Sequence, residues 1–131
     1  MKKMILASLL TNVAVLIPVC VSMLLDASWV TEEYGMATPA RGVLLSVYGA
    51  ILVVSIGLLF KREPKLVAPL LLVQALYKLT TPFTVGSFTN PVVISNLVIA
   101  AMHLTTLGLI VNEMPRKAAK TDTALTRITF N

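Results

Sequence analysis

The chain has 131 residues, of which 56% are hydrophobic and 13% charged, with a formal net charge of +5 at pH 7. Together with a mean hydropathy of +0.85, these values indicate a one-domain integral membrane protein and exclude an ordinary soluble chain. The basic residues lie in short clusters beside apolar runs, not interleaved with aromatic residues, so no nucleic acid partner is expected. The single cysteine, Cys20, excludes an intramolecular disulfide, a CxxC redox centre and a cysteine zinc cage.

The first predicted span covers residues 4–25 and follows a Met-Lys-Lys start. It is longer than the roughly 7–15 apolar residues of a signal peptide and lacks a good cleavage site, so an uncleaved span is predicted. A polar loop, residues 26–40, follows and carries three acidic residues. Its Trp29 and Tyr34 suit the headgroup level of a membrane, and Arg41 is expected to pair with the acidic loop.

Three further apolar segments predict spans at residues 42–60, 66–86 and 92–111. A tight basic turn at 61–65 joins the second span to the third, and Pro91 suits the first turn of the last helix. We therefore predict an all-α membrane protein, a four-transmembrane-helix bundle. The remaining residues, 112–131, are basic and lack a sustained apolar period, which favours a largely disordered cytoplasmic tail.

The distribution of basic residues predicts the orientation of the bundle. Four spans place both termini on one side of the membrane, and on the other side only Arg41 lies near the membrane. Nine basic residues fall on the side of the termini: Lys2, Lys3, Lys61, Arg62, Lys65, Arg116, Lys117, Lys120 and Arg127. This positive-inside bias predicts a multi-pass protein of the cell inner (plasma) membrane with cytoplasmic N- and C-termini.

The third span carries a polar face in the middle of an apolar helix. Gln74, Tyr77, Lys78 and Thr81 fall within an arc of about 100° at helical spacing. Because a lysine at this depth is costly in lipid, Lys78 is expected to face the bundle interior, with a partner or a task. The alternative is that Lys78 extends to the outer interface and pairs with an acid of the 26–40 loop.

Polar residues of the other spans fall at matching depths. At about 1.5 Å per residue, Asn12, Gln74 and His103 lie about 12 Å from the cytoplasmic ends of their helices. Tyr48 and Lys78 lie about 18 Å from those ends, so two stacked polar layers are expected. The alternative is that these groups only join helices, through hydrogen bonds worth about 0.6–2 kcal/mol each.

Small residues recur on one face of the second span at spacings of four, four and seven: Gly42, Ser46, Ala50 and Gly57. Such a face lets two helix backbones approach closely, so we interpret it as a packing surface. Arg41, Tyr48 and Ser55 share a different face, at spacings of seven.

Enzyme chemistry has no support in the motifs. The spans contain no paired carboxylates, no Ser/His/Asp grouping and no glycine-rich phosphate loop, so no catalytic residue is assigned. His103 is the single histidine, and the chain cannot supply three or four metal ligands at one depth. We expect neither a metal nor a cofactor. A small multidrug transporter is also disfavoured, because the first span lacks the membrane-embedded glutamate on which those proteins rely.

The order of a charged start, an outer loop and Arg41 leading into Tyr48-Gly49 resembles the DoxX-like group of small bacterial four-span membrane proteins. The resemblance covers the four spans, roughly residues 4–111, and rests on the architecture and an R-x6-Y-G pattern. It implies the four-span fold. Members of that group are often of unknown function, and some are associated with quinone-linked redox systems. No site residue carries over from the resemblance.

Three hypotheses for the function follow. The first is a non-enzymatic protein that binds a small amphipathic or anionic ligand, such as a lipid or quinone, or serves as an accessory membrane subunit. Its candidate ligand-binding residues are Lys78, Tyr77, Gln74, Tyr48, His103 and Asn96. The second is a small transporter or channel whose path is lined by Lys78 and His103. The third is a structural partner. Expected partners are membrane lipid, the ligand, and further copies or a larger membrane complex.

Overall fold

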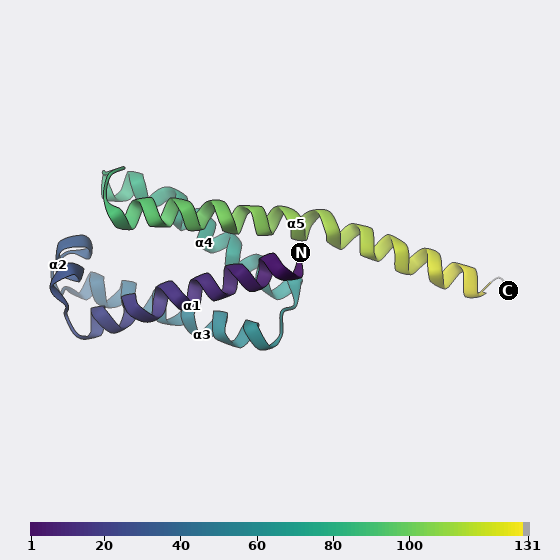
Figure 1. The fold of residues 1–131 in the computed structure, drawn as a ribbon, viewed down its shortest axis with the longest axis horizontal. Coiled ribbons are helices and arrows are strands. Elements are labelled where there is room, and N and C mark those ends of the chain that lie inside the picture. Colours follow the sequence, from purple (N-terminus) through teal and green to yellow (C-terminus); the bar gives the residue numbers. More distant parts are fainter. Residues whose placement is uncertain (130–131) are drawn as a thin grey trace.

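The computed structural model describes the backbone of residues 1–129 and the side chains of residues 1–115. This part of the chain holds five helices and no strand: α1 (Lys2–Leu24), α2 (Ser28–Tyr34), α3 (Pro39–Phe60), α4 (Pro64–Val85) and α5 (Pro91–Thr129). The four long helices are each long and apolar enough to cross a membrane. They run alternately in opposite directions (Figure 1). The predicted all-α bundle with four membrane-spanning helices is confirmed.

Local sequence signals explain where the long helices begin and end. Proline begins α3, α4 and α5, at Pro39, Pro64 and Pro91. Proline suits the first helical turn because its missing N–H would have no intrahelical partner there, and its φ angle is already helical. Helix α4 ends at Val85 and is followed by Gly86, whose φ of 70° is left-handed, a conformation that glycine adopts without a Cβ penalty.

Two segments differ from the sequence prediction. The predicted polar loop 26–40 contains a seven-residue helix, α2, because Val30 is fully buried and anchors it to the bundle. The last helix does not end near residue 111, the predicted end of the fourth span, but continues to Thr129 and leaves the bundle (Figure 1). The N-terminal ammonium of Met1 pairs with Glu113 at 3.2 Å, which ties the start of this continuation to α1. Residues 130 and 131 of the predicted tail lie outside the described residues.

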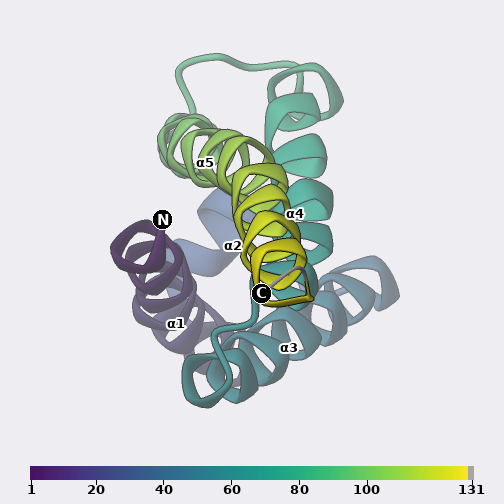
Figure 2. The same ribbon diagram turned by 90° about the vertical axis from the view of Figure 1, so that its right-hand side faces the viewer.

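The long helices form two pairs. Helix α1 packs along α3, and α4 packs along α5, while contacts between the pairs are fewer. Figure 2 shows this arrangement end-on, with α2 at the far end between the pairs. Any cavity large enough for a ligand is therefore expected between the two pairs.

At the end of the bundle that holds the N-terminus, all four long helices share one apolar core. Its buried members are Ile5, Leu9, Leu58, Val67, Leu71 and Ile110. We call this end the closed half. Because each long helix contributes to the same cluster, the closed half holds the two pairs together.

At the opposite end, the buried apolar cluster involves only one pair and the short helix. Its buried members come from α1, α2 and α3: Leu16, Cys20, Met23, Val30, Tyr48 and Ile51. From α4 only partly buried side chains, Leu70 and Tyr77, pack against it. We call this end the open half, because its core does not join the two pairs.

The small-residue face of α3, which the sequence indicates as a packing surface, does not pack against another helix of the bundle within the described residues. Gly42, Ser46, Ala50 and Gly57 are all exposed. Apart from its chain neighbours and the nearby backbone of its own helix, a methyl group at Gly42 or Gly57 would meet no heavy atom of the described residues within 4 Å. The face that turns inward is the one with polar side chains, Arg41, Tyr48 and Ser55. Polar groups need hydrogen-bond partners away from lipid, whereas small side chains do not.

Candidate functional site

Helix α2 closes the end of the open half and is bonded to both sides of it. Arg41 of α3 donates from Nη1 to the Gly35 carbonyl oxygen at 2.9 Å and forms an ion pair with Asp26. On the other side, Asn90, which precedes α5, donates from Nδ2 to Glu33 Oε2 at 2.8 Å. The expected pairing of Arg41 with the acidic loop is confirmed. Helix α2 therefore bridges the two helix pairs.

Four aromatic rings form a continuous row across the open half. The ring centroids lie 6.2 Å apart for Trp29 and Tyr34, 6.3 Å for Tyr34 and Tyr48, and 6.5 Å for Tyr48 and Tyr77. The first two contacts are edge-to-face, a favourable geometry for aromatic quadrupoles. Burial raises the pKa of the Tyr34 hydroxyl above its ordinary value, so this group stays neutral at physiological pH.

Lys78 of α4 lies inside the bundle and is only 4% exposed. Its ammonium donates to Asn96 Oδ1 of α5 at 2.7 Å and lies 4.9 Å from the centroid of the Tyr77 ring. Among residues 1–115, no carboxylate lies within 4.0 Å of it. Lys78 therefore does not extend to the outer interface, and the alternative pairing with the acidic loop is not formed.

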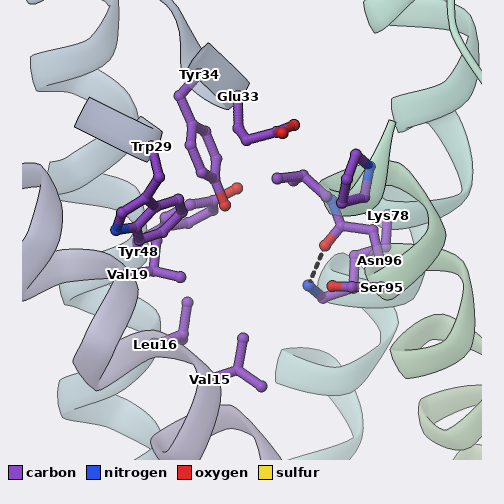
Figure 3. A pocket seen from close by; sticks show the side chains of 12 residues that line it. Val15, Leu16, Val19, Trp29, Glu33, Tyr34, Tyr48, Lys78, Ser95 and Asn96 are labelled. Atoms are coloured by element: carbon purple, nitrogen blue, oxygen red, sulfur yellow. Dashed lines mark hydrogen bonds between the residues drawn. The ribbon is translucent and has the colours of Figure 1, made fainter. Parts of the chain in front are cut away.

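Two adjoining cavities occupy the open half. The first, of about 370 Å³, lies between Lys78 and Asn96 on one side and three rings of the aromatic row, Trp29, Tyr34 and Tyr48, on the other (Figure 3). The second, of about 700 Å³, lies mainly between α3 and α4. The two share part of their lining: Glu33, Tyr34, Tyr48, Val92 and Asn96. Both volumes fall within the range of about 300–1,000 Å³ that is typical of small-molecule sites.

The chemistry of these walls suits a ligand oxygen beside flat or apolar groups. An ammonium has three N–H donors, and the bond to Asn96 uses one of those of Lys78. The buried hydroxyl of Tyr77, in the wall of the larger cavity, has no hydrogen-bond partner among the described residues. An anionic or carbonyl oxygen placed between these donors would complete their hydrogen bonding.

A second polar layer separates the cavities from the closed half. Asn12 of α1 donates from Nδ2 to Ser55 Oγ at 3.1 Å, and its Oδ1 lies 3.1 Å from His103 Nε2. Since Oδ1 can only accept, His103 carries its proton on Nε2, as assigned from this network. Nearer the closed half, Ser8 and Thr106 join α1 to α5 through hydroxyls 2.8 Å apart. Asn12 and His103, which the sequence predicts at the same depth together with Gln74, are thus in contact.

Gln74 is buried without a hydrogen bond. Its side chain is 1% exposed, and neither amide atom has a partner within the described part of the chain. His103 Nδ1 is likewise buried and unpartnered. Neither residue lines the two cavities. Of the six predicted ligand-binding residues, the structure thus brings Lys78, Tyr77, Tyr48 and Asn96 to the cavities and leaves Gln74 and His103 below them.

Sequence reasoning missed the contribution of α2 to the site. Trp29, Glu33 and Tyr34 line the first cavity, although the sequence placed them in an outer loop. A seven-residue helix gives too little periodicity to reveal an inward face. The available signal was the concentration of aromatic and acidic side chains around one apolar residue, Val30.

Metal binding has no support in the described side chains. Among them, no three His, Cys, Asp or Glu residues cluster closely enough to hold an ion.

Comparison with known proteins gives no match: no protein-family model, no curated protein and no solved structure matches this chain. The site is therefore interpreted from its own chemistry.

Proposed function

We propose that this protein binds a small amphipathic molecule, of lipid or quinone type, in the open half of its membrane domain. One observation carries the proposal: the buried ammonium of Lys78 faces a cavity and has no carboxylate partner among the described residues. An uncompensated charge in a membrane interior costs several kcal/mol and is typical of functional sites. A ligand with an anionic or carbonyl oxygen supplies the missing partner.

The remaining walls suit the apolar part of such a ligand. Tyr48 and Tyr77 present ring surfaces on either side of the gap between α3 and α4, and valine and leucine side chains line the larger cavity around them. Ligand sites commonly combine apolar and aromatic walls with a few placed polar groups. This composition favours an amphipathic molecule over a small inorganic anion.

The polar layer below the cavities supports binding over transport. His103, which would line a transport path, is fully buried and bonded to Asn12, and the apolar core of the closed half follows. A ligand that entered the cavities would meet this closed layer instead of a continuous path. The transporter or channel hypothesis therefore has less support than the binding hypothesis.

The orientation follows from the charge distribution. The positive-inside bias supports an orientation with the closed half and both termini toward the cytoplasm of a cell inner membrane and α2 on the outer side. On this arrangement the ligand comes from the outer leaflet or the outer aqueous space. The resemblance to DoxX-like proteins also remains a proposal. Arg41 and Tyr48, which carry it, both lie on the buried face of α3.

Replacement of Lys78 tests the proposal. The full chain is purified in mild detergent, and co-purifying small molecules are identified by native mass spectrometry. We expect Lys78→Met to reduce ligand occupancy roughly tenfold or more, since a hydrogen bond to a charged group contributes about 1.5–3 kcal/mol. Lys65→Met, at an exposed position of the same helix, is the matched control and should retain the ligand. Full occupancy in a folded Lys78→Met variant would contradict the proposal.

A further inference from the structure

The first cavity carries two opposite charges that do not pair with each other. Lys78 and Glu33 both line it, yet their charged atoms are more than 4.0 Å apart. Lys78 is bonded to Asn96, and Glu33 Oε2 accepts from Asn90. A simple anion would meet the unfavourable field of Glu33, and a simple cation that of Lys78. A molecule that carries both charges matches both sides of the cavity.

The Glu33 side of the cavity suits a cationic group in particular. Trp29, Tyr34 and Tyr48 line the same cavity, and Figure 3 shows them with Glu33, opposite the Lys78–Asn96 pair. Aromatic rings attract ammonium groups through their negative faces, and this is a common way to recognise alkylated amines. A carboxylate beside such rings adds direct charge compensation. Glu33 Oε1 makes no hydrogen bond among the described residues and is available for this contact.

The second cavity extends the site along the lipid-facing surface. Its apolar lining includes Val47 of α3 and Val73 and Val85 of α4, which are 47%, 62% and 51% exposed on the outside of the bundle. The cavity is therefore continuous with the surface that lipid chains cover. Because α3 and α4 have few contacts with each other, a chain has room to lie between them.

The order of these features along the bundle matches the order of groups in a phospholipid. Glu33 lies on α2, at the end of the open half. Along α4, Lys78 lies about 10 Å below Val85, and Val73 lies about 8 Å further toward the closed half, at 1.5 Å per residue. From the end inward, the site thus presents an acidic group and then a basic group, and the groove, which begins level with Val85, continues past the level of Lys78 to Val73. A phospholipid with an amine headgroup presents an amine, a phosphate and acyl chains in the same order.

We propose that the ligand is a zwitterionic phospholipid, whose amine contacts Glu33 and the neighbouring rings and whose phosphate contacts Lys78. Its acyl chains lie in the groove between α3 and α4. This inference rests on the proposed function and names the ligand class of the same site. A quinone lacks the amine that Glu33 recognises, and a fatty acid or other single anion meets Glu33 unfavourably.

A comparison of two lipids with identical chains tests the inference. Full-length protein in detergent is titrated with palmitoyl-oleoyl phosphatidylethanolamine or with palmitoyl-oleoyl phosphatidylglycerol, and binding is measured by native mass spectrometry. We expect the zwitterionic lipid to bind roughly tenfold more tightly, from a charge-assisted contact of about 1.5 kcal/mol. Equal binding of the two lipids by the unmodified protein overturns the inference.

Variants of α2 assign the preference to a residue. Glu33→Gln should remove the preference for phosphatidylethanolamine, whereas Glu32→Gln, at the exposed neighbouring acid, should preserve it. A preference that survives in Glu33→Gln contradicts the inference, and so does one that Glu32→Gln abolishes.

Lys78→Met separates this inference from the proposed function. If both lipids bind equally and both lose affinity in Lys78→Met, the zwitterion inference is wrong and the proposed function stands. The zwitterion inference is also wrong, and the proposed function also stands, if neither lipid binds the unmodified protein but a quinone binds it and loses affinity in Lys78→Met. If Lys78→Met changes the binding of no amphipathic molecule, both proposals are wrong.

Discussion

The two halves of the bundle use the same four helices for different purposes. In the closed half, every long helix contributes a fully buried or nearly buried side chain to one core, including Ile5, Leu58, Leu71 and Ile110. In the open half, the buried cluster comes from α1, α2 and α3 alone, and two cavities lie where a four-helix core would have been. The closed half therefore sets the stability of the bundle, and the open half can retain a cavity.

The contrast also separates two kinds of buried polar group. Apart from Gln74, the buried polar residues near the closed half bond to one another across helices, as Asn12 does with both Ser55 and His103. In the open half, Lys78 has a neutral hydrogen-bond partner but no carboxylate partner among the described residues. Neutral groups that are bonded across helices are expected to contribute to folding, whereas a charge without an opposite charge is expected to contribute to binding.

The largest change in the free energy of unfolding is expected for a large-to-small substitution in the core of the closed half. Leu71→Ala should lower the free energy of unfolding by roughly 2–5 kcal/mol, because the neighbouring side chains fill the space only partly. Leu72→Ala, at a lipid-facing position that is 49% exposed, should cost much less. Unfolding in mixed detergent micelles containing sodium dodecyl sulfate measures both. Equal losses would show that the closed half does not set the stability of the bundle.

The next-largest change in the free energy of unfolding is an increase, and it is expected for a substitution in the open half. Without ligand, Lys78→Met should raise the free energy of unfolding by roughly 1–3 kcal/mol, because it removes a charge that is costly to bury in a membrane. The same variant should lose ligand occupancy. A variant less stable than the unmodified protein in the absence of ligand would show that Lys78 is a structural residue.

A smaller energy is expected for the hydrogen bonds of the polar layer between the closed half and the open half. In a double-mutant cycle of Asn12→Ala and His103→Ala, the coupling energy should be about 0.6–1.7 kcal/mol, the range of hydrogen bonds between membrane helices. Thr11→Ala is a suitable control, because Thr11 reaches only the Met102 sulfur, at 3.7 Å. A coupling energy near zero would show that the Asn12–His103 contact does not hold α1 to α5.

The smallest effect on global stability is expected at α2. Arg41→Gln removes an ion pair with Asp26, a partly exposed carboxylate, so the free energy of unfolding should change by about 1 kcal/mol or less. Amide hydrogen exchange in residues 28–34 should nevertheless rise, because the bond to the Gly35 carbonyl is lost as well. Unchanged exchange in α2 would indicate that Glu33 and the buried Val30 hold it without Arg41.

The architecture was predictable because its signals are local. The long apolar runs predict spans, and the prolines at the starts of α3, α4 and α5 fix where the last three of those spans begin. Lys78 was predictable as an inward-facing residue from the cost of a lysine in lipid alone. Its partner Asn96 was a candidate only as a polar residue of the last span. The pairing depends on the register of α4 against α5, which no local pattern encodes.

Other features depend on how the helices face one another. The small face of α3 has the pattern of a packing surface, but a membrane protein has lipid as a second apolar neighbour, so the pattern does not say which side it faces. The inward side was set by Arg41, Tyr48 and Ser55, which need polar partners. The contribution of Glu33 was hidden for a related reason: its position over the cavity follows from the fold of α2, not from a periodic pattern.

The bridging position of α2 also gives the protein a built-in optical reporter. The helix is bonded to α3 through Arg41 and to the segment before α5 through Glu33, so a change in the separation of the two pairs must alter one of these contacts. Trp29 lies on α2, in the wall of the first cavity, and is the only tryptophan in the chain. Its fluorescence therefore arises from one known place, and entry of a molecule into the open half can be followed by emission wavelength and quenching without any label.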